Sequence, residues 1–74
     1  MQVDVKLFAS LQEGHFKEQK TELNDNSRVI DVIKKYDIPL EEMSICLVNG
    51  RDADNDQVLH DGDTVSLFPP VGGA

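Results

Sequence analysis

Apolar and polar residues alternate with a period of two in three segments of the chain, as they do in half-buried β-strands. The alternation is clearest over residues 3–7 and 64–68, and residues 20–23 show it more briefly. In each segment the apolar residues share one face. The pattern therefore predicts three strands that each turn one side toward a common core.

The middle of the chain changes to a helical period. Residues 24–27 are of types that commonly cap helix N-termini, and Pro39 is expected to end the helix. The expected buried face consists of Val29, Ile30, Ile33 and Tyr36. The expected water-facing residues are Arg28, Asp31, Lys34 and Lys35, of which the two lysines suit the helix C-terminus. Residues 40–43 are expected to add one further turn.

The remaining segments read as loops, turns and one buried strand. Residues 9–18 are of mixed polarity and predict a loop anchored by Leu11 and Phe16. Residues 44–49 are almost continuously apolar, which predicts a strand covered on both faces. Asn49-Gly50 is a strong hairpin signal, because both turn positions need a positive φ. Residues 51–58 are polar and are expected to contain at most a short strand. Residues 61–63 predict a second tight turn.

The order of these elements predicts an α+β fold with one helix packed across a mixed sheet of four to five strands. The helix buries its apolar face best if the first and last strands are parallel neighbours at the centre. That arrangement is the ubiquitin-like β-grasp. We expect residues 1–68 to form this domain and residues 69–74 to form an extended C-terminal tail.

Composition narrows the choice of partner. The 74 residues are enough for one small domain, and no apolar run approaches the roughly 20 residues of a membrane span. Seven basic and 14 acidic residues give a net charge of −7. This charge argues against nucleic acid and anionic membrane and favours a basic protein surface, although it also serves solubility. With one cysteine, Cys46, no internal disulfide is possible, and we expect a cytoplasmic protein.

The C-terminal segment has the composition of a threading tail. Pro69 and Pro70 fix φ and remove two backbone donors, so the chain leaves the last strand stiff and extended. Gly72 and Gly73 then allow another protein's backbone to approach closely. Although glycine-rich ends are often merely frayed, a stiff stalk favours a projection that presents a carboxyl group to an active site elsewhere.

Three segments together resemble the small subunit of molybdopterin synthase, within the ubiquitin-like sulfur carriers of the MoaD and ThiS type. They span most of the chain, and the last combines turn, strand, diproline and diglycine in one order. The segments are KLFASLQE (6–13), VNG (48–50) and LHDGDTVSLFPPVGG (59–73).

The resemblance implies a co-substrate rather than an enzyme. An E1-like activating enzyme would use ATP to adenylate the Gly73 carboxylate, which would then become a thiocarboxylate. The chain itself would bind no cofactor. The tail, comprising Pro69, Pro70, Val71, Gly72 and Gly73, would enter the large synthase subunit, or another sulfur-accepting synthase, which would supply the catalytic groups.

Ala74 departs from the family pattern, which ends at the second glycine. While Ala74 is attached, the Gly73 carbonyl is an amide and cannot be adenylated. Either a protease removes Ala74, which we expect, or the partner accepts a different terminus, or the chain is no longer a carrier. Three alternatives stay open: a sulfur carrier of another pathway such as thiamine synthesis, a ubiquitin-like modifier joined to lysines through Gly73, and an interaction module with an inert tail.

Phe8 and Phe68 occupy the non-core phase of their strands. If those strands are parallel neighbours, both rings lie near the base of the tail, where they would form a docking patch. An equally weighted alternative is that the loop carrying Leu11 and Phe16 covers them.

Other candidate residues favour structural roles. Cys46 lies among apolar neighbours and reads as a buried small hydrophobe. His15 and His60 lack partners at ligand spacing and read as surface or turn residues. The aspartates match the spacing of a calcium loop only in part, because Gln57 stands where the loop requires glycine and no closing glutamate follows; they are Asp52, Asp54, Asp56 and Asp63. We therefore expect no metal site.

Overall fold

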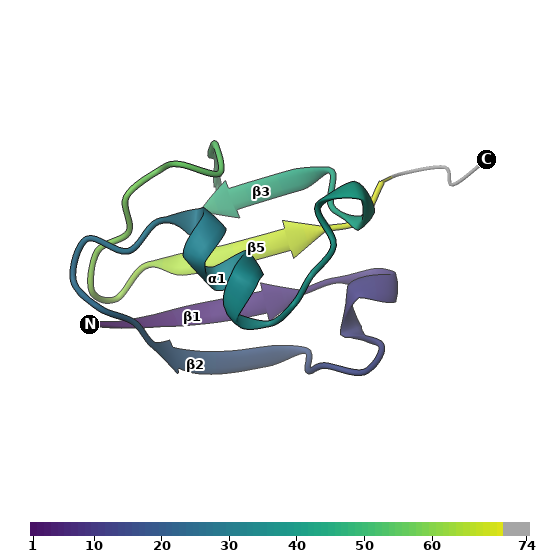
Figure 1. The fold of residues 1–74 in the computed structure, drawn as a ribbon, viewed down its shortest axis with the longest axis horizontal. Coiled ribbons are helices and arrows are strands. Elements are labelled where there is room, and N and C mark those ends of the chain that lie inside the picture. Colours follow the sequence, from purple (N-terminus) through teal and green to yellow (C-terminus); the bar gives the residue numbers. More distant parts are fainter. Residues whose placement is uncertain (71–74) are drawn as a thin grey trace.

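The two strands with the clearest alternation lie side by side at the centre of the sheet (Figure 1). In the computed structural model, which describes residues 1–70, β1 (Gln2–Leu7) and β5 (Thr64–Phe68) are parallel neighbours. The sheet has five strands in the order β2-β1-β5-β3-β4. The other strands are β2 (Glu18–Glu22), β3 (Ile45–Val48) and β4 (Arg51–Asp52). The predicted mixed sheet of the β-grasp is confirmed.

The core lies between one face of this sheet and α1 (Val29–Lys35), which crosses it (Figure 1). The predicted sheet residues are buried, and they are Val3, Val5, Leu7, Val65 and Leu67. From the helix, Val29 and Ile33 are buried as predicted, whereas Ile30 and Tyr36 are only partly buried. Val32, which the predicted face left out, is fully buried. The apolar stripe of α1 is therefore rotated relative to the predicted one.

The helix does not begin at the predicted capping cluster. Arg28 is its N-cap, and the Asp31 carboxylate accepts a hydrogen bond of 2.7 Å from the Arg28 backbone N–H. The first two helical N–H groups, of Val29 and Ile30, donate to the carbonyl oxygens of Gln57 and Asn55 at 3.0 and 2.7 Å. Carbonyl groups from a distant loop thus satisfy donors that a local side chain was expected to cap.

The helix also ends before Pro39. Asp37 adopts a φ of 53°, its N–H donates to the Lys34 carbonyl, and the Ile38 N–H donates to the Ile33 carbonyl. This hydrogen-bond pair is a Schellman motif, in which a left-handed residue terminates the helix. Pro39 instead precedes the short 3₁₀ helix η2 (Leu40–Glu42), which is the predicted extra turn.

The prediction that residues 44–49 are covered on both faces is wrong. Cys46 and Val48 are buried on the helix side, but Ile45 is 40% exposed and Leu47 is half-buried. The reason is that this fold has only two layers, so the sheet face away from α1 has no second cover among the described residues.

The loop after β1 contains the 3₁₀ helix η1 (Ala9–Gln12), and both predicted anchors hold it. Leu11 is buried, and the half-buried Phe16 packs edge-on against Tyr36 with ring centroids 4.8 Å apart. The Tyr36 hydroxyl lies 2.6 Å from the hydroxyl of the buried Thr21 on β2. The loop, β2 and the end of α1 are thereby joined.

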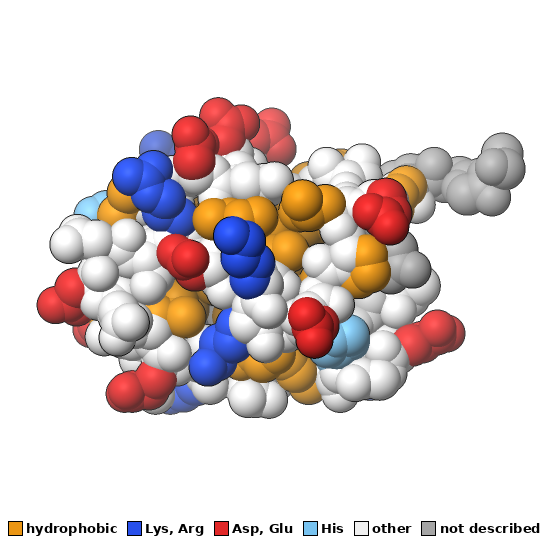
Figure 2. Space-filling model, in the orientation of Figure 1, with side chains coloured by type: hydrophobic (Ala, Val, Ile, Leu, Met, Phe, Trp, Pro, Cys, Tyr) orange, Lys and Arg blue, Asp and Glu red, His pale blue; other side chains and the backbone are white. Residues whose placement is uncertain are grey.

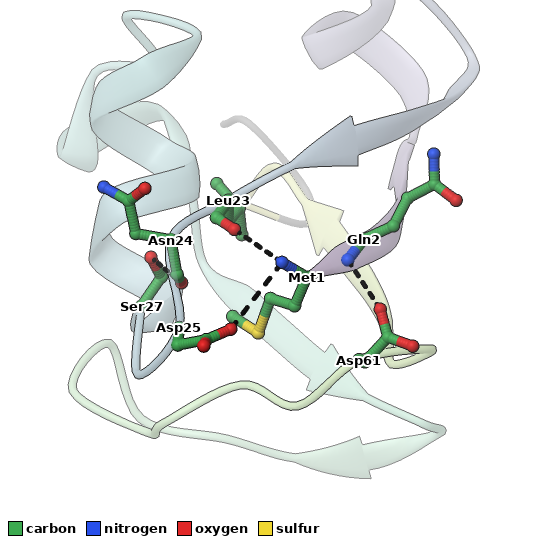
Figure 3. A network of polar contacts seen from close by, with 7 residues as sticks. All are labelled: Met1, Gln2, Leu23, Asn24, Asp25, Ser27 and Asp61. Atoms are coloured by element: carbon green, nitrogen blue, oxygen red, sulfur yellow. Dashed lines mark hydrogen bonds and ion pairs between the residues drawn. The ribbon is translucent and has the colours of Figure 1, made fainter.

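Hydrogen bonds and an ion pair hold the first two residues of the chain in place, as Figure 3 shows. The Met1 ammonium donates to the Leu23 carbonyl at 2.9 Å and lies 3.7 Å from the Asp25 carboxylate. The Gln2 N–H donates to Asp61 at 2.7 Å, within the predicted turn around Gly62, whose φ is 88°. These contacts join the start of β1 to the turn that follows β2 and to the turn that precedes β5.

Charged residues lie over the outer surface of this fold. On the helix side, Figure 2 shows Lys and Arg side chains over α1 and Asp and Glu side chains dispersed around them. Within residues 1–70, no helix is long and apolar enough to cross a membrane.

Candidate functional site

The predicted tail begins where the central strand β5 ends, so the sheet holds its base from both sides. On one side, the Phe8 N–H donates to the Leu67 carbonyl at 3.2 Å. On the other side, Phe68 pairs with Ile45, and the Ser44 N–H donates to the Phe68 carbonyl at 2.8 Å. The chain after Phe68 consequently starts from a fixed position and direction. Of the predicted tail residues, Pro69 is half-buried and Pro70 is exposed.

Phe8 and Phe68 are brought together at this position. Their rings stack with centroids 4.3 Å apart and an interplanar angle of 11°, and both residues are half-buried. Such aromatic pairs contribute about 0.5–1.5 kcal/mol beyond the area they bury. The predicted shared phase of the two side chains is confirmed, although their role in binding stays a prediction. The predicted loop anchors do not cover them, since Leu11 joins the core and Phe16 packs on Tyr36.

Sequence reasoning missed two further apolar residues on the same sheet face. Ile45 pairs with Phe68, and Leu47 pairs with Ser66, which lies two residues before Phe68 in β5. We call Phe8, Phe68, Ile45 and Leu47 the tail-base face. The available signal was phase, because Ile45 and Leu47 alternate with Cys46 and Val48 and so cannot share their side of the sheet.

The tail-base face has charged residues along its borders. Leu47 pairs with Asp52 on β4, while Lys6 lies between Ser66 and Glu18 in the adjoining register positions. An apolar centre with a charged border is the usual composition of a protein-binding surface.

Other candidate residues lie away from this face or are buried. Burial of Cys46 raises the pKa of its thiol from 9.0 to about 11, so the thiol is held protonated, as a small hydrophobe would be. His15 and His60 are exposed, as predicted, and the two ring nitrogens of His15 lie 3.0 and 2.8 Å from the carbonyl oxygens of Glu13 and Tyr36. Within residues 1–70, no group of three His, Cys, Asp or Glu residues is placed to hold a metal ion.

Open hollows lie at both ends of the sheet. Two, of about 600 and 610 Å³, are lined mainly by polar residues around Asn24 and around Asn49, at the end of the sheet opposite to β5's last residue. A third, of about 280 Å³, adjoins the tail-base face and is lined by Lys6, Leu7, Phe8, Gln12, Lys17 and Glu18. Val71, Gly72, Gly73 and Ala74 lie outside the described residues, so the predicted reactive carboxylate is not placed.

Comparisons with known proteins agree with this geometry. A family model for the ThiS family matches residues 5–73. A Pyrococcus furiosus protein assigned as molybdopterin converting factor subunit 1 is 32% identical, with 96% of this chain and 99% of that chain covered and a TM-score of 0.81. A search of curated protein sequences gave no significant match.

Two further solved structures are similar over nearly their full lengths. One is the complex of subunits 1 and 2 of molybdopterin-converting factor from Helicobacter pylori 26695, at 25% identity, 100% coverage of both chains and a TM-score of 0.68. The other is small archaeal modifier protein 1 from Methanosarcina acetivorans, at 28% identity, 99% and 96% coverage and a TM-score of 0.67. Because the family model matches almost the whole chain, this protein belongs to the ThiS family of ubiquitin-like sulfur carriers.

Proposed function

We propose that this chain carries sulfur as a thiocarboxylate on Gly73 and acts as the small subunit of a molybdopterin synthase. Its ThiS family membership supports the carrier chemistry. The pathway is supported by the 32% identity to the assigned molybdopterin converting factor subunit 1. A large-subunit partner is supported by the similarity to the Helicobacter pylori complex of subunits 1 and 2.

The observation that carries this proposal is the position of the tail on the fold. The last described residues, Pro69 and Pro70, follow the central strand β5. The chain leaves the sheet directly after Phe68, whose ring stacks on Phe8. A partner that binds the tail-base face meets the tail where the chain leaves β5. The residues after Pro70 then reach a reactive centre in that partner, and a core this small need not contain one.

The chemistry depends on a free carboxylate. A Gly73 carboxylate oxygen attacks the α-phosphorus of ATP bound to an E1-like enzyme and releases pyrophosphate. A nucleophile that supplies sulfur at the oxidation level of sulfide, such as hydrosulfide, then displaces AMP from the acyl adenylate to leave the thiocarboxylate. Because an amide has no such oxygen nucleophile, whatever follows Gly73, beginning with Ala74, must first be removed by a protease. The catalytic groups belong to the partners in this scheme.

Adenylation measured on three forms of the chain tests this proposal. A chain that stops at Gly73 should support ATP–pyrophosphate exchange by the activating enzyme of the same host. A chain that retains Ala74 should not do so until it is trimmed, and a chain that stops at Gly72 is the length control. Equal exchange with and without Ala74 would show that processing is unnecessary. No exchange with any form would contradict the carrier function.

The docking role of Phe68 is tested with a matched pair of charge substitutions on β5. Phe68→Glu places a carboxylate on the tail-base face, whereas Thr64→Glu places one on the same strand four residues away from the tail base. We expect Phe68→Glu to weaken binding to the large subunit at least tenfold, with a native circular dichroism spectrum, and Thr64→Glu to have little effect. Equal affinities of the two variants would place docking elsewhere.

A second function is supported by the similarity to small archaeal modifier protein 1. The same activated Gly73 would then be transferred to lysine side chains of other proteins. Mass spectrometry of the chain from its host separates these functions. A Gly73 terminus in which sulfur replaces oxygen indicates the carrier, and adducts joined to lysines indicate the modifier. A carrier of another pathway would form the thiocarboxylate but would not bind the large synthase subunit.

A further inference from the structure

The turn between β3 and β4 consists of Asn49 and Gly50, a chemically reactive pair that has no role in the proposed carrier function. Asn49 and Gly50 both have positive φ, at 54° and 82°, and both are exposed. The Asn49 N–H donates to the Thr64 carbonyl at 2.8 Å, which fixes the turn to the start of β5. In an Asn-Gly sequence the following residue has no Cβ to hinder attack by its backbone nitrogen on the asparagine side chain.

The Asn49 side chain is held by two hydrogen bonds of opposite sense. Its Oδ1 accepts from the Thr64 N–H at 3.0 Å, and its Nδ2 donates to Asp63 Oδ1 at 2.9 Å. The Asp63 side chain is only 14% exposed, and its other oxygen, Oδ2, accepts from the His60 N–H at 2.8 Å. Asp63 therefore needs a donor at position 49, and an amide supplies one whereas a carboxylate does not.

We propose that Asn49 is a spontaneous deamidation site, that its contact with Asp63 slows the reaction, and that the product loosens the β3–β4 hairpin from β5. This inference does not depend on the proposed function, because the turn lies at the end of the sheet opposite to the tail base.

The reaction needs only water as a co-reactant. The backbone nitrogen of Gly50 loses its proton and attacks Cγ of Asn49, which forms a five-membered succinimide. The Cγ–Nδ2 bond breaks, and the nitrogen leaves as ammonia with the proton given up by the backbone. Water then adds to one of the two carbonyl carbons of the ring and breaks the bond from that carbon to the ring nitrogen. Attack at Cγ gives aspartate, and attack at the main-chain carbonyl carbon gives isoaspartate. No atom is oxidised or reduced.

The folded structure restrains the first step. Attack requires the Asn49 side chain to rotate until Cγ meets the Gly50 nitrogen, and the hydrogen bonds to Thr64 and Asp63 restrict this rotation. The rate is therefore governed by local opening of the turn. Substitution of Asp63 removes one restraint and leaves the backbone turn in place.

The product conflicts with its surroundings. An aspartate at position 49 places a carboxylate oxygen against Asp63 Oδ1, at the position from which the amide donated at 2.9 Å. Two carboxylates this close repel each other, and the partial burial of Asp63 reduces the screening of that repulsion by water. Isoaspartate also lengthens the main chain within a tight turn, so the Thr64 contacts cannot all be kept.

The rate is tested by incubating the full chain in mildly alkaline buffer and mapping deamidation by peptide mass spectrometry. Asn24, Asn26 and Asn55 are internal controls, because none precedes glycine. We expect Asn49 to react first, and Asp63→Ala to accelerate it several-fold without changing the controls. If Asp63→Ala does not fold, wild-type chain in urea replaces it. Equal rates at Asn49 with and without the restraint would overturn the proposal.

The consequence is tested by a double-mutant cycle. Asn49→Asp mimics the product and should lower the urea midpoint of unfolding. Asn49→Asp combined with Asp63→Asn restores an amide–carboxylate pair with the roles exchanged, and we expect most of the loss to be recovered. An Asn49→Asp variant as stable as wild type, or a double variant no better than the single one, would contradict the proposed repulsion.

Discussion

The packing of α1 on the sheet is most directly examined by truncating Ile33. Ile33 is 2% exposed and belongs to the buried cluster between the helix and the sheet. Ile33→Ala removes three side-chain carbons, each worth about 0.8 kcal/mol when buried. That gives about 2.4 kcal/mol from transfer alone, and the cavity left behind raises the expected cost to about 2–5 kcal/mol.

This loss is large for so small a domain. At about 0.05–0.15 kcal/mol per residue, a chain of 74 residues has roughly 4–11 kcal/mol of stability. Urea unfolding followed by circular dichroism measures the change. With an m-value of about 1 kcal/mol/M, the midpoint should fall by at least about 2 M. Ile30→Ala is the matched control, because it removes the same atoms from a partly buried position. The packing would be refuted if Ile33→Ala cost no more than Ile30→Ala.

Two other predictions concern single positions. Asp37→Gly should stabilise the fold by about 0.5–1 kcal/mol, because glycine accepts the φ of 53° without strain and removes a carboxylate from the helix C-terminus; a lower Tm would contradict this. The raised pKa of Cys46 keeps the folded thiol protonated while the unfolded one ionises, so stability should decline from pH 9.0 toward about 11. Urea midpoints across that range should show the decline in wild type and less of it in Cys46→Ala, and identical slopes would refute the assignment.

Much of the fold was predictable because its signals are local. Alternation in residues 3–7 and 64–68 assigns each side chain to a face, since strand geometry allows only two. Asn49-Gly50 predicts its turn because few residue pairs adopt positive φ twice in succession. The order of elements then left few ways to bury one helix against one sheet.

The candidate site was predictable only in part. Phase placed Phe8 and Phe68 on one face, and the structure stacks them. Ile45 and Leu47 were missed because an apolar run does not reveal whether a second layer covers its outer side. Their exposure follows from the absence of any described segment packed over that face of β3.

Other features depend on segments that meet only in the folded chain. The helix begins at Val29 because carbonyl groups of Asn55 and Gln57 accept hydrogen bonds from its first two N–H groups. These contacts cannot be predicted from residues 24–27. Thr21 is buried because the Tyr36 hydroxyl reaches it from the end of α1. The periodicities, the turns and the composition of the tail depend on neighbouring residues, so they can be derived from the sequence alone. The start of the helix and the exposure of individual apolar residues depend on what lies across the core, so they are fixed only when the chain has folded.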